Sequence, residues 1–199
     1  MRTLLLATTN EHKLKEFRAI LRELPFTLLS LRDIQLGMDV EETGTTFAEN
    51  ALLKARAYAQ AANMLALTDD SGLEIDALGG APGIYSARFA GRETPYTERF
   101  RLILARLQDV PVSQRTARFR CAIALADPSG YTRVVEGTIE GLIAESPRGE
   151  NGFGYDPIFL VPEYGKTTAE MTSEEKHRIS HRGRAAEAAC RLLKDGPFR

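Results

Sequence analysis

The chain has 199 residues, 43% of them apolar, which is enough for a substantial core in one domain or two closely packed lobes. Its 26 basic and 27 acidic residues give a formal net charge of -1, so no overall positive field attracts nucleic acid or an anionic membrane. The cysteines Cys121 and Cys190 form no CxxC pair, which argues against a disulfide scaffold or a zinc site and favours a reducing cytoplasm.

The first elements alternate between strand and helix signals. Residues 3–7 are a short apolar run typical of a buried strand, too short for a signal peptide, and residues 8–24 have the spacing of an amphipathic helix. A second strand is expected at residues 26–31. The segment "TFAE" has capping-box spacing and predicts a second helix over residues 46–62.

The middle of the chain brings two acidic residues to the end of a strand. Residues 64–68 predict a strand that leads into Asp69 and Asp70, and residues 79–91 form a loop rich in glycine. A helix is expected at residues 94–107.

The last part adds a hairpin and two helices. Residues 117–126 alternate as a half-buried strand, the turn "DPSG" follows, and residues 131–144 are the expected antiparallel partner. A short strand is expected at 158–161, before helices at 172–179 and 181–194. The pattern predicts an α/β protein with a mixed sheet. Because no linker divides residues 1–199, we expect a single domain.

The first strand runs directly into a helix at "TTNEHK". Free N–H groups at a helix start can hold an anion, and Thr8, Thr9 and Asn10 add side-chain donors there. The alternative is that Thr9 or Asn10 is simply the N-cap. Lys13 lies in the first helical turn, where its positive charge is unfavourable beside the positive end of the helix dipole. A phosphate bound between Lys13 and the helix start would remove this penalty. The glycines of a Walker loop are absent.

Asp69 and Asp70 lie at the carboxyl end of a strand, where open α/β sheets bind ligands. If the strand continues through them, their side chains point to opposite faces, so one faces a ligand while the other braces the loop. An Asx-type turn with Gly72 is the structural alternative.

A loop carboxylate and a helical lysine could complete a phosphate site. Glu41 lies in the loop "EETG", and Lys54 lies on the second helix; each is also typical of a solvated surface. Magnesium prefers a few carboxylate oxygens together with substrate phosphates. Glu41, one aspartate and Mg²⁺, with lysines on the phosphates, would support metal-assisted phosphoryl chemistry.

Aromatic and basic residues near the C-terminus could recognise a nucleobase. Phe153 lies between glycines in "NGFGYDP" and could stack on a base or anchor the loop in the core. His181 and Arg182 precede the last helix, where their donors could bind carbonyl oxygens of a purine. Lys176 could bind phosphate or form part of a solvated face. The histidines lack HExxH spacing and there is no GxSxG motif, so zinc hydrolysis and acyl transfer are unsupported.

Five segments together resemble one family: "TTNEHK", "EETGTTFAENALLKA", "DDSGLEIDALGGAPGIYSARFAG", "GFGYDPIF" and "TSEEKHRISHRG". In this order they resemble the HAM1, or inosine triphosphate pyrophosphatase, family, over residues 3–184. The resemblance implies hydrolysis of ITP, dITP and XTP to the monophosphate and pyrophosphate, dependence on Mg²⁺, and a homodimer. It also implies an elongated mixed sheet flanked by helices, with two lobes around a central nucleotide-binding cleft.

The resemblance also implies roles for individual residues. Asp70 would be the proton acceptor and, with Glu41, a ligand of Mg²⁺. The triphosphate would be bound by Thr8, Thr9, Asn10, Glu11, His12 and Lys13. Further contacts to the substrate would come from Ser71, Phe153, Gly154, Tyr155, Asp156, Lys176, His181 and Arg182. Phe153 would stack on the base, and Thr9 stands where the family commonly has Gly or Ser.

The expected mechanism is attack of water on the α-phosphorus with pyrophosphate as leaving group. The phosphate charge would be neutralised by Lys13, Lys54 and Lys176. His181 and Arg182 would donate hydrogen bonds to a 6-keto purine and disfavour a 6-amino group. The alternatives are a Maf-like pyrophosphatase of other nucleotides, a purine nucleotide-binding protein without turnover, and a nucleic-acid-binding protein, which the near-neutral charge disfavours.

Overall fold

The computed structural model describes residues 2–198, and its contacts divide the chain into two compact units. The first unit comprises Met1–Asp70, Cys121–Gly137 and His181–Arg199. The second unit comprises Ser71–Arg120 and Thr138–Ser180.

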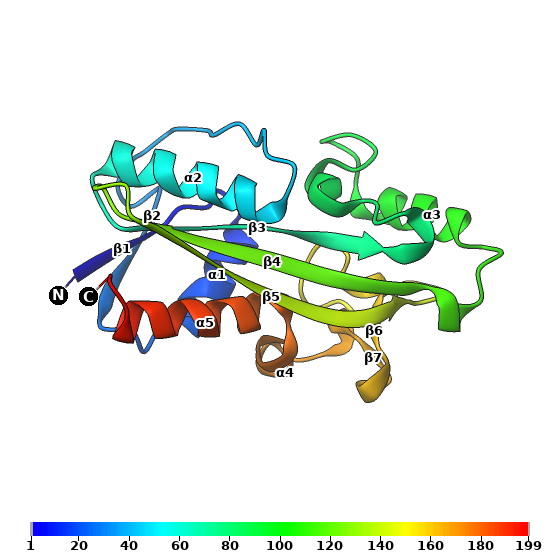
Figure 1. Cartoon of the computed structure of the whole chain (residues 1–199). Helices are drawn as coiled ribbons and strands as arrows, with labels where there is room; N and C mark the ends of the chain where they lie inside the picture. Colours follow the sequence, from blue (N-terminus) through cyan, green and yellow to red (C-terminus); the bar gives the residue numbers. More distant parts are fainter. Residues whose placement is uncertain (1, 199) are drawn as a thin grey trace. The chain divides into compact units, whose positions relative to one another are not determined.

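Within residues 2–198 the strands form one seven-stranded sheet in the order β2-β1-β3-β4-β5-β6-β7 (Figure 1). The strands are β1 (Arg2–Leu6), β2 (Phe26–Ser30), β3 (Ala66–Ile75), β4 (Thr116–Ala126), β5 (Thr132–Ile143), β6 (Phe159–Val161) and β7 (Lys166–Thr167). β1 pairs with β2 and β3 in parallel, and β6 pairs with β5 and β7 antiparallel. The expected α/β class with a mixed sheet is therefore confirmed.

The helices cover the sequence ranges that the periodicity predicts, with shifted ends. They are α1 (Glu11–Ile20), α2 (Phe47–Ala62), α3 (Tyr96–Arg106), α4 (Ser173–Ile179) and α5 (His181–Asp195). Short 3-10 helices lie between them: η1 (Asp76–Leu78), η2 (Gly83–Arg88), η3 (Val112–Gln114), η4 (Asp156–Ile158), η5 (Pro162–Tyr164) and η6 (Thr168–Glu170).

In the first unit, helices cover both faces of β1. α2 lies over one face, and α1 and α5 lie over the other (Figure 1). On the α1 and α5 side, Leu4 and Leu6 of β1 point into a core that includes Phe17 of α1 and Ala185 and Ala189 of α5. Alternate strand residues thus meet the spaced apolar positions of two helices, as expected for a parallel sheet.

The second unit has a separate core. Leu73 and Ile75 of β3, Phe119 of β4 and Phe100 of α3 are buried together with Phe159 of β6. The rings of Phe119 and Phe159 lie 4.5 Å apart between centroids. This core holds the outer part of the sheet independently of the apolar residues in the first unit.

β3 is longer than the sequence pattern predicts. The expected strand stops at residue 68, whereas β3 continues through Asp69 and Asp70 to Ile75. The strand can continue because each carboxylate has cationic or amide partners on its own side, so neither must turn out toward water. The alternative interpretation, an Asx-type turn with Gly72, is therefore wrong.

The starts of the first two helices differ in detail from the expected pattern. α1 begins at Glu11, after the N-cap Asn10, rather than at residue 8. At α2, Thr46 accepts the Glu49 amide as an N-cap, and the Glu49 carboxylate accepts the Thr45 amide and hydroxyl. Across residues 2–198, no helix combines the length and apolar composition needed to span a membrane.

Candidate active site

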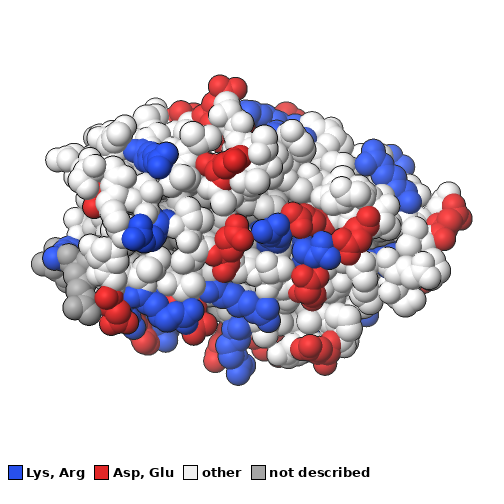
Figure 2. Space-filling view, in the orientation of Figure 1, with Lys and Arg blue, Asp and Glu red and all other residues white. Residues whose placement is uncertain are grey.

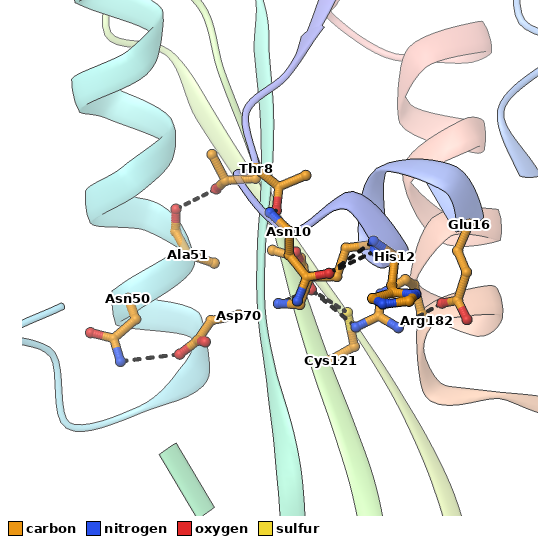
Figure 3. A network of polar contacts seen from close by, with 12 residues as sticks. Thr8, Asn10, His12, Glu16, Asn50, Ala51, Asp70, Cys121 and Arg182 are labelled. Atoms are coloured by element: carbon orange, nitrogen blue, oxygen red, sulfur yellow. Dashed lines mark hydrogen bonds and ion pairs between the residues drawn. The ribbon is translucent and has the colours of Figure 1, made fainter. Parts of the chain in front are cut away.

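The loop between β1 and α1 is closed by its own side chains (Figure 3). Asn10 Oδ1 accepts the amides of His12 and Lys13 at 3.0 and 3.1 Å, and Thr8 Oγ1 accepts the Asn10 amide at 3.2 Å. Asn10 is therefore the N-cap, which was one of the two interpretations of this segment. Since the His12 and Lys13 amides already have an acceptor, an anion here would meet side chains rather than these N–H groups.

The same loop borders open space. Thr8, Thr9 and Glu11 line a cavity of about 640 Å³ together with Arg18 and Arg32. Arg32 Nη2 lies 3.4 Å from Glu11 Oε1. Thr9, Asn10 and the following two residues are exposed at the surface. A polar ligand therefore has room to approach the segment that the sequence singles out for phosphates.

Asp69 binds cations from α1 and α5. Its Oδ2 lies 2.9 Å from Lys13 Nζ and 3.4 Å from Arg182 Nη2, and the Cys121 thiol donates to it at 3.9 Å. Arg182 Nη1 donates in turn to Glu16 Oε2 at 2.7 Å. Burial works to raise the pKa of Asp69, but Lys13 and Arg182 lower it well below its usual range. Asp69 thus links β3 to α1 and α5 through ion pairs.

Asp70, the next residue, faces α2 instead. Asn50 Nδ2 donates to Asp70 Oδ2 at 3.1 Å, while Lys54 Nζ lies 3.9 Å from Asp70 Oδ1 and donates to Glu42 Oε1 at 2.7 Å. Asn50 Oδ1 accepts the Gly44 amide at 2.8 Å. Burial raises the pKa of Asp70, and the charge of Glu42 adds to this, although Lys54 opposes it. A buried carboxylate with a raised pKa is suited to accept a proton.

The two aspartates therefore point to opposite faces of β3, as their alternation in a strand predicts. Asp69 joins Lys13 and Arg182, and Asp70 joins Asn50 and Lys54. Figure 3 shows Asp70 and Asn50 on the α2 side and Arg182 beside Glu16 on the other. The two carboxylates therefore have different partners, ammonium and guanidinium groups of α1 and α5 for Asp69 and side chains of α2 for Asp70.

The carboxylates around Asp70 fit a magnesium ion held partly by substrate. Glu42 approaches Lys54, whereas its neighbour Glu41 is exposed in the same loop. No group of three or more His, Cys, Asp or Glu side chains within residues 2–198 is arranged to hold a metal by itself. Mg²⁺ needs only one or two carboxylates when phosphate oxygens supply further ligands. The donor chemistry of Asp70 with Glu41 or Glu42 therefore suits Mg²⁺.

The second unit holds another buried polar cluster, around Asp156. Asp156 Oδ2 accepts the Lys176 ammonium at 2.7 Å and the Phe153 amide at 2.8 Å. The Lys176 Nζ lies 5.0 Å from the centre of the Phe153 ring. Phe153 is half-buried, so part of its ring is accessible. Its ring and the adjacent ammonium are suited to stack on and bond a heterocycle.

Tyr155 anchors this loop. Its ring is 3% exposed and lies 5.2 Å from the Tyr96 ring, and its hydroxyl donates to the Ser86 carbonyl at 2.9 Å. Burial raises the pKa of Tyr155. The Tyr155 side chain therefore belongs to the core, although the sequence suggests a contact to substrate. Gly154, beside it, has φ +65°, which favours glycine at this turn.

The predicted residues are divided between the two units. Those of the first unit are Thr8, Thr9, Asn10, Glu11, His12, Lys13, Glu41, Lys54, Asp70, His181 and Arg182. Those of the second unit are Ser71, Phe153, Gly154, Tyr155, Asp156 and Lys176. His181 and Arg182 are both buried at the start of α5, and Ser71 is half-buried on β3.

Comparison with known proteins decides the family. Residues 4–192 match the family model described as the Ham1 family. The chain belongs to the Ham1 family. The resemblance carried by the five sequence segments is thereby confirmed, and the match covers nearly the whole chain.

Relatives of this Ham1 protein are similar along their full length. It is 50% identical over 193 residues to the dITP/XTP pyrophosphatase of Bacillus subtilis, covering 97% of this chain and 98% of that protein. It is 53% identical over 192 residues to a dITP/XTP pyrophosphatase of Thermus thermophilus, covering 96% of this chain and 92% of that protein. A solved HAM1 protein of Coxiella burnetii superposes with a TM-score of 0.90 at 43% identity, covering 98% of this chain and 100% of that one.

Sequence reasoning missed several residues of the Ham1 protein's clusters. Glu42, rather than Glu41, contacts Lys54, and Glu16 balances Arg182. The pair of glutamates in "EETG" indicates that either could contact Lys54, because only one of two neighbouring side chains can face inward. Nothing in the sequence paired Glu16 with Arg182, which are 166 residues apart.

Proposed function

We propose that this Ham1 protein hydrolyses ITP, dITP and XTP to the nucleoside monophosphate and pyrophosphate and so removes non-standard purines from the nucleotide pool. The observation that carries the proposal is Asp70, a buried carboxylate that Asn50 orients and that lies 3.9 Å from the Lys54 ammonium. The activity for which the two bacterial relatives described above are named, dITP/XTP pyrophosphatase, supports the same reaction.

The reaction begins with attack of water on the α-phosphorus, and Asp70 accepts the proton of that water. A base of raised pKa is better matched to this task near neutral pH than an ordinary carboxylate. The ammonium groups of Lys13 and Lys54 stabilise negative charge that develops on the phosphates, and the bond to pyrophosphate then breaks. Lys13 is itself held by Asp69, which limits its motion.

A magnesium ion would be held by Asp70 with Glu41 or Glu42 and by phosphate oxygens. When bound, Mg²⁺ supplies Lewis-acid polarisation of the phosphoryl oxygens. We include Glu42 as a candidate because its carboxylate reaches Lys54, beside Asp70.

Base recognition uses the cluster around Phe153. The Phe153 ring stacks on the purine, and the Lys176 ammonium donates to the 6-keto oxygen. A 6-amino group would face this donor with donors of its own, at a penalty of roughly 1–3 kcal/mol. Arg182 and Lys176 are both buried and paired, Arg182 with Glu16 and Asp69 and Lys176 with Asp156. We assign the role to Lys176 because its ammonium lies beside the Phe153 ring.

The proposal extends to the setting of the enzyme. We expect a homodimer that acts in the cytoplasm, where Cys121 and Cys190 stay reduced. Burial raises the pKa of the Cys121 thiol to about 12, so this cysteine is a poor nucleophile.

A substrate panel tests the proposed function. The protein is incubated with Mg²⁺ and ITP, XTP, GTP, ATP or dTTP, and pyrophosphate and orthophosphate are measured separately. We expect pyrophosphate from ITP and XTP at rates at least about tenfold above those with ATP, from the difference in hydrogen bonding at position 6. Faster turnover of dTTP would favour a Maf-like pyrophosphatase. Orthophosphate as the first product, or no turnover of ITP and XTP, would exclude the proposal.

A further inference from the structure

The Asp156 carboxylate has different partners on its two oxygens, and all of them belong to the second unit. Oδ2 accepts from Lys176 and from the Phe153 amide, as described above. Oδ1 accepts the Thr168 hydroxyl at 2.8 Å. Asp156, Thr168 and Lys176 are between 2% and 4% exposed, so water screens these bonds little.

The Thr168 hydroxyl has one proton and two acceptors within reach. The Asp156 backbone carbonyl lies 3.2 Å away, and the carboxylate oxygen lies 2.8 Å away. A bond to an ionised acceptor is shorter and stronger than one to a neutral carbonyl. The proton therefore belongs to the carboxylate oxygen.

A second bonded oxygen fixes the plane of the carboxylate. The terminal torsion of Asp is broad, so bonds to Oδ2 alone would leave the group free to rotate and to carry the Lys176 ammonium with it. On the Oδ2 side the backbone of Gly152 lies so close that a Cβ there would collide with Asp156 Oδ2. Gly152, with φ +73°, thus permits the close approach, and Thr168 determines the orientation.

We infer that Thr168 is a positioning residue for base recognition. Through Asp156 it holds the Lys176 ammonium over the Phe153 ring, 5.0 Å from the ring centre. Thr168 touches neither base nor phosphate in this account and acts only through Asp156. The inference rests on the proposed function, since it assigns Lys176 and Phe153 to the base.

The neighbouring threonine offers a matched control. Thr167 is also buried, but its hydroxyl donates to the Arg148 carbonyl at 2.7 Å and its side chain caps η6. Thr167→Val therefore removes a buried hydroxyl one residue away without changing a bond to Asp156. Any loss that comes from general destabilisation of this segment should be at least as large in Thr167→Val as in Thr168→Val.

Calorimetry with two probes tests the inference. The dissociation constants of α,β-methylene-ITP and of inorganic tripolyphosphate are measured for wild type, Thr168→Val, Thr168→Ser and Thr167→Val, with Mg²⁺ present, and melting temperatures are recorded. We expect Thr168→Val to raise the dissociation constant of the ITP analogue about tenfold, as for loss of one charge-assisted hydrogen bond. Its dissociation constant for tripolyphosphate should stay within about twofold of the wild-type value. Thr168→Ser and Thr167→Val should both bind the ITP analogue with the wild-type dissociation constant.

Turnover gives a second readout. In Thr168→Val the KM for ITP should rise about tenfold while kcat stays within about threefold, since the residue acts on binding of the base. Thr168→Ala is measured in the same way and replaces Thr168→Val if the valine variant does not fold.

Several results would overturn the inference. The inference is wrong if Thr168→Val binds the ITP analogue as tightly as the wild type, or if its affinity for tripolyphosphate falls by the same factor. It is also wrong if Thr168→Ser does not restore binding of the ITP analogue, or if Thr167→Val loses as much affinity as Thr168→Val. A wild-type protein that binds the ITP analogue but releases no pyrophosphate from ITP would refute the proposed function alone, because the binding comparison still decides the role of Thr168. Absence of binding by the wild type would refute both.

Discussion

Two adjacent carboxylates of β3 have opposite pKa shifts. Asp69 is buried, but the Lys13 and Arg182 charges lower its pKa, whereas burial raises the pKa of Asp70. Titratable neighbours whose environments separate their pKa values often divide chemical roles between them. The contrast supports our proposal that Asp70 transfers the proton and that Asp69 braces the neighbouring elements.

Replacement of the reactive carboxylate should abolish most turnover without unfolding the protein. We predict that Asp70→Asn lowers kcat for ITP at least about 100-fold, as for loss of a general base. Its melting temperature should not fall, because the change removes a buried charge whose ionisation burial disfavours. Steady-state kinetics and a thermal melt measure the two effects.

The neighbouring variant is the control. Asp69→Asn leaves Lys13 and Arg182 without their buried carboxylate, which typically costs about 3–5 kcal/mol. It should therefore lower the melting temperature clearly. If Asp70→Asn turned over ITP like the wild type, or if only Asp70→Asn were unstable, the assignment of the two roles would be wrong.

At this scale the sequence predicted types of residue better than their partners. The strand alternation correctly separated Asp69 from Asp70. It placed Arg182 among donors to the base, whereas the structure buries its guanidinium between Glu16 and Asp69. Spacing within one segment reveals which side chains share a face, but an ion pair between α1 and α5 depends on packing of distant segments.

Charged side chains of β4, β5 and η1 lie together in the second unit. Arg118 donates to both oxygens of Asp76 at 2.8 and 2.9 Å and also contacts Glu140, while Thr116 donates to Asp76 at 2.7 Å. Figure 2 shows acidic and basic side chains interspersed on the side in view. Cross-strand pairs of opposite charge support the sheet modestly where they are solvent-exposed.

These charged side chains should make stability depend on pH in the acid range. Bonds from Arg118 and Thr116 lower the pKa of Asp76 below its usual 3.8. The contribution of ionised Asp76 to the free energy of unfolding is therefore fully present above pH 3.8, and it is lost as the pH falls through the lower pKa of the folded state. We predict that Asp76→Asn lowers the melting temperature by about 1–2 °C at pH 7, a small effect because the pair is exposed.

Thermal melts at several pH values measure the difference between wild type and Asp76→Asn. The difference should shrink as the pH falls below 3.8. Thr116→Val removes only one donor to Asp76, so it should also lower the melting temperature, by less than Asp76→Asn does. A difference that grew on acidification would contradict the assigned direction of the pKa shift.

Elements were predicted well where their periodicity was long, and poorly where tertiary partners set their ends. The ranges of α1, α2, α3 and α5 agree with the apolar spacing, apart from their first and last residues. β7 has two residues and leaves no pattern in the sequence. The extension of β3 through its aspartates depends on cations and amides supplied by other elements, which no local pattern reveals.

On the scale of the whole molecule, the chain has two compact units, and three of the four boundaries between them fall inside strands. The changes at residues 70/71 and 120/121 lie within β3 and β4, and that at 137/138 lies within β5. Composition changes and linkers could not reveal such boundaries, because strands continue through them. Each unit has its own apolar core and its own buried polar cluster.

The clusters supply different parts of the proposed chemistry. In the proposed function, Asp70 and the phosphate-binding lysines come from the first unit, and Phe153 and Lys176 come from the second unit. The formal net charge of -1 agrees with an enzyme that attracts an anionic substrate through local groups rather than through an overall field.

The central claim is that water attacks the α-phosphorus of a non-standard purine triphosphate. Hydrolysis of ITP by the protein with Mg²⁺ in water enriched in oxygen-18, followed by mass spectrometry of the products, tests this directly. Attack on the α-phosphorus should place one labelled oxygen in the inosine monophosphate and none in the pyrophosphate. Label in pyrophosphate, or in orthophosphate released as the first product, would show attack at another phosphorus and contradict it.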